Sequence, residues 1–223
     1  MQVFFDHREL LAPGIWQHYF RSERPVRFEP GQYVDLQLPL IGSDPRGATR
    51  TFTLTSLPKQ PLLSFVTKDQ PYRSLYKQVL AGLQPRTAAT ITDPMGDLVL
   101  PKDPATPVSF VAGGIGVSSF ISMLHTLEYA QKPRQVQLYY AVRSSEEVIF
   151  ADSIDSFAFE YHEVCIAPAR LKPIQMVKKA PRGCIWYISG SQRFVETMRG
   201  SLLATGIDRQ AIVFDYYDGY AEL

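Results

Sequence analysis

The sequence predicts two domains in series, an antiparallel β-barrel followed by an α/β domain with a Rossmann-like, doubly wound parallel sheet. The length of 223 residues suits one large domain or two modest ones. Before residue 101, short β-rich runs alternate with turn residues, whereas after Pro101–Pro104 apolar strands alternate with helical segments. We therefore expect residues 1–101 to form the barrel and residues 102–223 to form the α/β domain.

Five β-rich runs predict the strands of the barrel. They are Gln2–Phe5, Gln32–Leu38, Thr51–Thr55, Leu62–Thr67 and Ala88–Thr92. Val, Phe, Tyr, Leu and Thr dominate these runs, and Gly, Pro and Asp punctuate the segments between them. One helix is expected in this region, because leucines and a valine repeat at helical spacing over residues 75–83 and Ser74 can cap the first turn.

The second region predicts a parallel sheet, because strand and helix alternate along it. The expected strands are Val108–Ala112, Val136–Val142, Tyr161–Ile166, Cys184–Ile188 and Ala211–Phe214. The expected helices run from Ser118 to Tyr129, with an apolar stripe, and from Arg193 to Ala204.

Composition excludes several classes of function. Lys and Arg total 23 against 22 for Asp and Glu, so the charge is too balanced for nucleic-acid binding. The two cysteines and four histidines lack the spacing of a metal site. The amino terminus meets a charge too early for a signal peptide, and the uncharged stretch 104–127 is too rich in Gly and Ser for a membrane span. We expect a cytoplasmic protein with no membrane span, no nucleic-acid partner and no metal.

The sharpest local signal is the glycine-rich segment Gly113-Gly-Ile-Gly116, placed between an apolar strand and an amphipathic helix. Glycines let the backbone turn sharply, and the following helix presents free N–H groups to an anion such as a pyrophosphate. The segment departs from the dinucleotide fingerprint G-x-G-x-x-G, because Ser119 holds its last position. A plain strand-to-helix turn therefore remains open.

The second signal is Arg50-Thr-Phe-Thr-Leu-Thr-Ser56, in which threonines alternate with apolar residues. The alternation predicts a strand with one hydroxylated and one apolar face. An arginine, an aromatic ring and hydroxyls this close together could grip a phosphate and stack on a planar ring. An ordinary half-buried strand with a solvated arginine is the alternative.

These two segments and five further motifs, in a fixed order along nearly the whole chain, resemble the ferredoxin–NADP reductase family. The segments are Phe28-Glu-Pro-Gly-Gln-Tyr-Val34, Arg50-Thr-Phe-Thr53, Gly96-Asp-Leu98, Gly113–Phe120, Tyr140-Ala-Val-Arg143, Ser189-Gly-Ser191 and Asp215–Tyr220. Members of that family are flavin-dependent oxidoreductases with a barrel followed by a nucleotide domain. The chain departs from the family pattern with serine at 119, 189 and 191, with Asp215, and with no glycine pair in residues 69–73.

The resemblance implies that the first domain is a flavin-binding domain of the ferredoxin-reductase type. Arg50 would pair with a flavin phosphate, Phe52 would stack on the isoalloxazine, and Thr53 would hydrogen-bond near flavin N5. The other implied flavin contacts are Thr51, Val66, Thr67 and, at the pyrophosphate, Ser74. FAD is favoured over FMN, and the altered 69–73 loop keeps FMN open.

For the second domain the resemblance implies a site for NADPH or NADH. The residues that would hold the dinucleotide are Gly113, Gly114, Ile115, Gly116 and Val117, with Arg143 and Ser144 at its adenosine end and Gly190 and Ser191 near Ser189. Ser189 would lie beside the reacting nicotinamide carbon, so Ser189 and Thr53 are the candidate catalytic residues. Tyr217 would cover the flavin. Ser189 as a strand end and Tyr217 as a core aromatic are the plain alternatives.

The implied function is a flavin-dependent oxidoreductase that takes hydride from NAD(P)H and passes electrons through FAD to a one-electron acceptor. An acidic residue at the end of the second strand would favour NADH. Arg143 stands there instead, which slightly favours NADPH as the cofactor. The acceptor could be ferredoxin, flavodoxin, another redox domain or a small molecule. The alternative is a non-autonomous flavin-binding electron-transfer or regulatory subunit of a larger redox complex, and the three serines that replace family residues motivate it.

Overall fold

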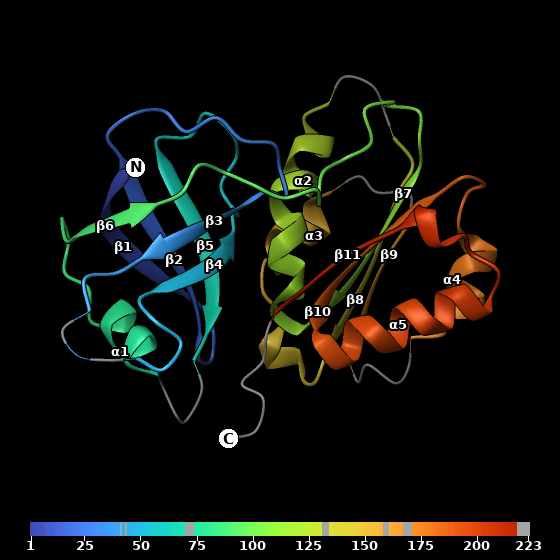
Figure 1. Ribbon diagram of the computed structural model, residues 1–223. Helices are drawn as coiled ribbons and strands as arrows, with labels where there is room; N and C mark the ends of the chain where they lie inside the picture. Colours follow the sequence, from blue (N-terminus) through green and yellow to red (C-terminus); the bar gives the residue numbers. More distant parts are fainter. Residues whose placement is uncertain are drawn as a thin grey trace. The chain divides into compact units, whose positions relative to one another are not determined.

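The computed structural model describes residues 1–40, 42, 44–69, 74–130, 134–157, 161–166 and 171–217, with only the backbone of Tyr161, Cys165 and Tyr217. The chain divides into two compact units, Met1–Val99 and Leu100–Leu223 (Figure 1). No helix in the described part of the chain has both the length and the apolarity that crossing a membrane requires.

The first unit is a six-stranded antiparallel sheet in the order β4-β3-β6-β1-β2-β5. Its elements are β1 (Gln2–Ala12), β2 (Ile15–Ser22), β3 (Tyr33–Gln37), β4 (Thr49–Thr53), β5 (Leu62–Lys68), the helix α1 (Leu75–Ala81) and β6 (Ala88–Ile91). The two edge strands approach each other, because the amide of Thr55, just after β4, donates to the carbonyl of Ser64 in β5 at 2.8 Å. The predicted antiparallel barrel is confirmed.

The barrel is filled by aromatic and branched side chains from alternate positions of its strands. Phe65 stands at the centre, with its ring 4.2 Å from that of Phe52 and 5.5 Å from that of Phe20. In β4, Phe52 lies opposite the buried Val34 of β3 and faces the interior, whereas Thr51 is exposed. The expected alternation therefore holds for Thr51 and Phe52 only, because Thr53 is buried and β4 ends there. Each ring buried in this way contributes about 1.5–3 kcal/mol to folding.

Strand β2 was not predicted from the sequence. The strand pattern is not visible in the sequence, because the polar residues Gln17 and His18 are both buried and interrupt the alternation of apolar and polar positions. Two irregularities in its pairing with β1, between Phe5 and His7 and between Leu10 and Ala12, shift the register further. The expected helix is present as α1, and Ser74 caps it by accepting a hydrogen bond from the Lys77 amide at 3.3 Å.

The second unit is a five-stranded parallel sheet in the order β11-β10-β7-β8-β9. Its strands are β7 (Val108–Gly113), β8 (Val136–Val142), β9 (Tyr161–Ile166), β10 (Ile185–Ser191) and β11 (Ile212–Tyr217). Its α-helices are α2 (Ser118–Glu128), α3 (Ala151–Ser156), α4 (Pro173–Lys179) and α5 (Gln192–Ala204). Helices α2 and α3 lie on one side of the sheet and α4 and α5 on the other (Figure 1), so the predicted doubly wound arrangement is confirmed.

Packing explains where the strand predictions succeeded. Every residue of β8 is buried, as a central parallel strand covered on both faces requires, and its apolar run, interrupted only by Gln137, marked its bounds in the sequence. Strand β10 runs to Ser191, three residues beyond the predicted end. The helices α3 and α4, of six and seven residues, were not predicted.

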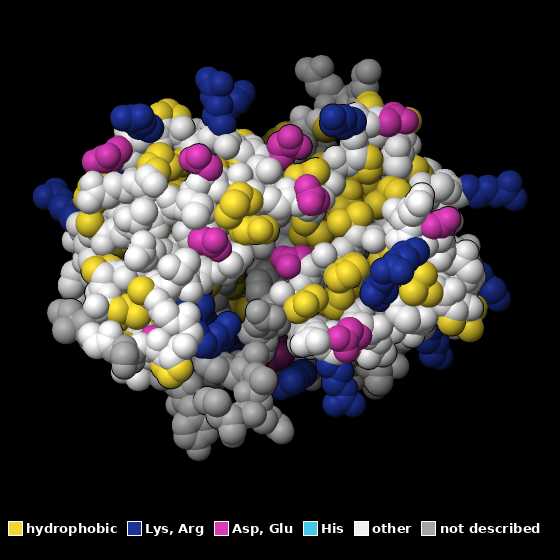
Figure 2. Space-filling view, viewed as in Figure 1, with side chains coloured by type: hydrophobic (Ala, Val, Ile, Leu, Met, Phe, Trp, Pro, Cys, Tyr) yellow, Lys and Arg dark blue, Asp and Glu magenta, His cyan; other side chains and the backbone are white. Residues whose placement is uncertain are grey.

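Charged groups are dispersed over the surface. Figure 2 shows Lys and Arg side chains scattered over one face and interspersed with Asp and Glu. This distribution agrees with a formal net charge of +1. This face therefore presents no broad basic surface of the kind that binds nucleic acid.

Candidate functional site

The carboxyl ends of β7 and β10 form the centre of the candidate site in the second unit. The strand order reverses between these neighbours, because the chain runs outward from β7 to β8 and β9 and then returns to β10 and β11. Connections leave such a pair toward opposite faces, and ligands of doubly wound sheets bind in the crevice that this creates. The glycine segment follows β7 directly, as the 3-10 turn η1 (Gly114–Val117).

The glycines of this turn are required by close backbone contacts. A Cβ atom at Gly116 would lie 2.3 Å from the carbonyl oxygen of Ser189, and one at Gly113 would lie 2.7 Å from the ring of Phe194. Gly114 differs, because its φ of +55° suits glycine and nothing lies within 4 Å of its Cβ position. The turn thus packs tightly against β10 and leaves open space above Gly114.

Ser189 itself faces the interior of the unit. Its hydroxyl donates to the hydroxyl of Ser119 at 3.1 Å, and neither residue has any exposed surface. Two residues later, Ser191 ends β10 and caps α5 by accepting a hydrogen bond from the Phe194 amide at 3.3 Å. The side chain of Ser189 therefore contacts helix α2, and only the Ser189 backbone borders the glycine turn.

The remaining predicted nucleotide residues lie at the same edge of the sheet. Arg143 and Ser144 follow β8, and the Arg143 amide donates to a carboxylate oxygen of Glu147 at 3.3 Å. Tyr217 ends β11 opposite Ser191, and its side chain lies outside the described residues. The structure thus brings the residues after β7, β8 and β10 to one edge.

In the barrel unit, Arg50 is held entirely by protein groups. Its Nη1 donates to the carbonyls of Arg46, Gly47 and Thr49 at 2.7–2.9 Å, and its Nη2 donates to Asp44 Oδ1 at 2.8 Å. Its guanidinium carbon also lies 4.8 Å from the ring centroid of Tyr76, within cation–π range.

Asp44 starts a tight turn that the local sequence dictates. Asp44-Pro45-Arg46-Gly47 has the residues that a β-turn prefers, and the Gly47 amide donates to the Asp44 carbonyl at 2.8 Å. The carboxylate accepts from the amides of Arg46 and Tyr76, each at 2.9 Å, and from Arg50. Burial would raise the Asp44 pKa, but these hydrogen bonds outweigh it and hold the pKa below its ordinary value.

Other predicted flavin residues are buried in the barrel. Phe52, Thr53, Val66 and Thr67 are all less than 9% exposed, and the Thr67 hydroxyl bonds the His18 ring at 3.0 Å. The ring of Phe52 already stacks on that of Phe65. The exposed Thr51 donates to an Asp35 carboxylate oxygen, and Ser74 serves as the cap of α1. Their roles in flavin binding remain proposals.

Known proteins share this architecture. Residues 110–186 match the family described as oxidoreductase NAD-binding domain. The flavohemoprotein of Bacillus cereus is 23% identical over 220 residues, which cover 88% of this chain and 54% of that protein. The toluate 1,2-dioxygenase electron transfer component of Pseudomonas putida is 28% identical over 66% of this chain and 43% of its own length. The chain thus spans about half the length of these curated relatives.

Solved structures agree over almost the whole chain. Phthalate dioxygenase reductase superposes with a TM-score of 0.79 at 21% identity, over 97% of this chain and 67% of its own. The FAD/NAD-binding domain of the Vibrio cholerae nitric oxide dioxygenase also gives 0.79, at 19% identity over 97% and 98% of the two chains. The chain therefore has the fold of these structures, and its residues 110–186 match an oxidoreductase NAD-binding domain. The fold that the resemblance implied is confirmed.

The barrel unit also carries an unusual buried histidine. His18 is 2% exposed, and its Nδ1 has no hydrogen-bond partner among the described residues. Burial disfavours the imidazolium and, with repulsion from Arg8 and Lys77, lowers the His18 pKa to about 3 from 6.5.

We expect this histidine to make stability depend on pH. In the unfolded chain His18 is protonated below its ordinary pKa of 6.5, whereas in the folded chain its pKa is about 3. His18 should therefore lower the free energy of unfolding by about 1.4 kcal/mol per pH unit as the pH falls between these values. Urea unfolding of the parent and of His18→Gln from pH 7 to 4 measures this contribution. Equal slopes in the two proteins would contradict it.

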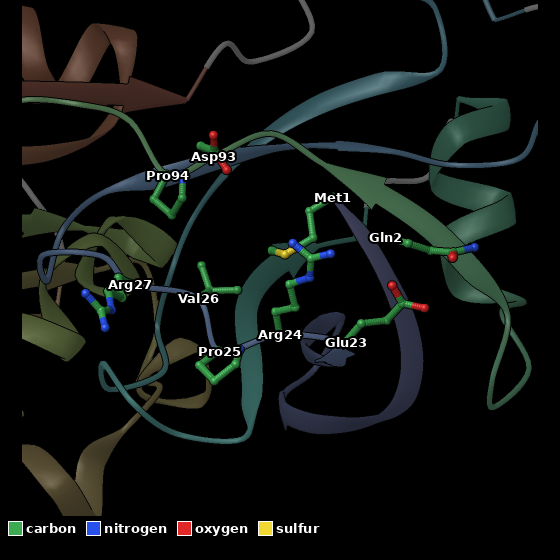
Figure 3. Close-up of a pocket in the computed structure, with 9 residues that line it drawn as sticks. All are labelled: Met1, Gln2, Glu23, Arg24, Pro25, Val26, Arg27, Asp93 and Pro94. Atoms are coloured by element: carbon green, nitrogen blue, oxygen red, sulfur yellow. The ribbon is translucent and has the colours of Figure 1, made fainter.

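A separate pocket of about 650 Å³ lies in the barrel unit near the amino terminus (Figure 3). It is lined by Met1, Gln2, Glu23, Arg24, Pro25, Val26, Arg27, Asp93 and Pro94. None of these belongs to the predicted site. Its mixed charges and open form do not indicate a ligand.

The residues of the two units differ in how well they fit the expected cofactors. The glycine turn fits a dinucleotide, because its tight side packs on β10 and its open side has no side chain above Gly114. Arg50, as it is arranged, does not fit a flavin phosphate, because Asp44 already supplies its anion.

Two residues at these sites, Asp44 and Phe194, were missed in the sequence. Asp44 lies in one of the segments between predicted strands, and a carboxylate six residues before Arg50 was a possible signal. Phe194 gave no signal, because its contact with Gly113 depends on how α5 packs against the sheet.

Proposed function

We propose that this chain is a flavin-dependent NAD(P)H oxidoreductase that passes electrons from NAD(P)H through FAD to a one-electron acceptor. In this proposal residues 1–101 form the flavin-binding domain and residues 102–223 the NAD(P)-binding domain. FAD, when bound, would supply the conversion of a two-electron hydride into single electrons. The acceptor would be ferredoxin, flavodoxin or another redox domain, and the protein would work in the cytoplasm.

One observation carries the proposal: the glycine turn lies at the reversal of strand order and touches the end of β10. Gly113 and Gly116 let the turn approach Ser189 and Phe194, while Gly114 leaves room for a ligand. A backbone cradle of this kind binds the pyrophosphate of a dinucleotide through its amides. The family match over residues 110–186 supports the same class of ligand.

The named relatives support electron transfer as the purpose. One is an electron transfer component of a dioxygenase, and another is the reductase component of a propane monooxygenase from Rhodococcus jostii. Both are longer than this chain. We therefore propose that electrons leave toward a separate protein or a further domain.

In the proposed reaction this chain's residues would bind and orient. The amides of the glycine turn would hold the dinucleotide, and Arg143 and Ser144 would contact its adenosine end. The Ser189 backbone would border the nicotinamide. The Ser189 hydroxyl, which donates a hydrogen bond to the Ser119 hydroxyl, would link β10 to α2. Ser189 is thus better suited to positioning than to contact with the reacting carbon.

A second candidate is a non-autonomous electron-transfer or regulatory subunit. Two observations favour it: the inward Ser189 hydroxyl and the pairing of Arg50 with Asp44. Oxidation of NADH or NADPH with ferricyanide, by the purified chain supplied with FAD, separates the candidates. Turnover supports the autonomous enzyme, and flavin binding without turnover supports the subunit.

Replacement of Gly114 by leucine tests the dinucleotide cradle. The side chain would fill the open space above the turn, so we expect the KM for NADH or NADPH to rise about tenfold or more, a loss of at least about 1.4 kcal/mol. Gly183→Leu is the matched control, because Gly183 also has a positive φ and open surroundings. Equal KM values in the two variants would remove the turn from the binding site.

A further inference from the structure

Arg50 is withheld from ligands by an internal salt bridge. Its terminal nitrogens have four protein acceptors, three carbonyls and the Asp44 carboxylate, and its side chain is only 12% exposed. A guanidinium is most useful for phosphate recognition when its paired N–H groups are free for two parallel hydrogen bonds. In this arrangement Nη1 and Nη2 each already donate to protein acceptors.

Asp44 offers Arg50 the same chemistry that a phosphate would offer. Its side chain has no exposed surface, and its two oxygens accept from the Arg46 amide, the Tyr76 amide and Arg50. Backbone amides combined with a guanidinium form a usual environment for an anion. Here the anion is part of the chain.

The neighbouring contacts hold this pair in place. The β-turn beginning at Asp44 fixes the carboxylate, and the ring of Tyr76 supports the guanidinium at 4.8 Å. Tyr76 is itself fully buried, with its hydroxyl donating to the Leu36 carbonyl at 2.9 Å. The pair therefore belongs to a built cluster of the barrel unit and is not a chance surface contact.

We propose that Asp44 is an internal competitor for the phosphate of a flavin nucleotide and so sets which part of the flavin the protein recognises. This inference rests on the proposed function. With Arg50 engaged, phosphate adds little to affinity, and binding depends on the ring system. Riboflavin, FMN and FAD then bind the parent protein with similar affinity. Asp44→Asn removes the competing charge and keeps the shape of the side chain, so it strengthens phosphate binding.

Titration of the parent chain and of Asp44→Asn with riboflavin, FMN and FAD, followed by flavin fluorescence, tests the proposal. The parent is expected to bind all three within about threefold. In Asp44→Asn, FMN and FAD should bind about tenfold tighter and riboflavin equally well, since one charge-assisted hydrogen bond gained is about a tenfold effect. Asp6→Asn is the matched control, because it breaks an exposed pair with Arg21 in the same unit and should change none of the three affinities.

If Asp44→Asn does not fold, the affinities of the parent for the three flavins still test the inference. A parent that binds FMN or FAD more than about tenfold tighter than riboflavin would overturn the inference and leave the proposed function intact. Failure of every protein to bind any of the three flavins would overturn the inference together with the proposed function.

Discussion

Gly116→Ala is expected to destabilise the second unit by about 3 kcal/mol, near the upper end for overpacking. The new methyl group would lie 2.3 Å from the Ser189 carbonyl oxygen, and a rigid strand backbone cannot yield as a flexible side chain can. Urea unfolding in a Trp16→Phe background measures the effect, because Trp186, buried in this unit, is then the only tryptophan.

The control for this experiment is Gly200→Ala in α5. Nothing lies within 4 Å of the Cβ position of Gly200, and alanine favours a helix by up to about 1 kcal/mol over glycine. Gly200→Ala should therefore match or exceed the parent in stability. A Gly116→Ala variant with the urea midpoint of the parent would show that the turn and β10 are not in close contact.

Arg50→Ala is expected to destabilise the barrel unit by roughly 3 kcal/mol at pH 7, because it leaves the fully buried Asp44 carboxylate without its counter-charge. The deficit should shrink as the pH falls. Without Arg50 the pKa of Asp44 rises, so the carboxyl group is protonated at a higher pH and no longer buries a charge. Urea unfolding at pH 7 and pH 5 in a Trp186→Phe background, with Trp16 as reporter, measures both effects.

Arg21→Ala provides the comparison. It breaks the pair with Asp6, in which the arginine side chain is 57% exposed, and exposed pairs contribute at most about 1 kcal/mol. If Arg50→Ala costs no more than Arg21→Ala, the Asp44–Arg50 pair does not stabilise the barrel as described.

The sequence predicted the second unit more completely than the first. Buried parallel strands are runs of mostly apolar residues, as in β8, where only Gln137 is polar, so their limits are visible without the structure. The glycine turn was visible for a similar reason, since only glycine tolerates the contact at Gly116. In the barrel, β2 was lost because His18 occupies an interior position that usually belongs to an apolar residue.

The side-chain partners at the candidate site could not be predicted. Motif spacing identified Arg50 and Ser189 but not the groups that they contact. Whether Arg50 faces a ligand or Asp44 depends on how the turn between β3 and β4 folds onto α1, which involves residues 32 positions apart. Likewise, the pairing of Ser189 with Ser119 depends on contacts across 70 positions. Local patterns do not contain such information.

The central claim is that this chain carries a flavin that NAD(P)H reduces. The direct measurement is the visible spectrum of the purified chain after reconstitution with FAD and removal of free flavin, recorded before and after anaerobic addition of NADH or NADPH, with the mass of the released chromophore. We predict a retained yellow chromophore with the mass of FAD, which bleaches when the nicotinamide is added. A chain that retains no flavin, or a bound flavin that stays oxidised with both nicotinamides, would contradict the claim.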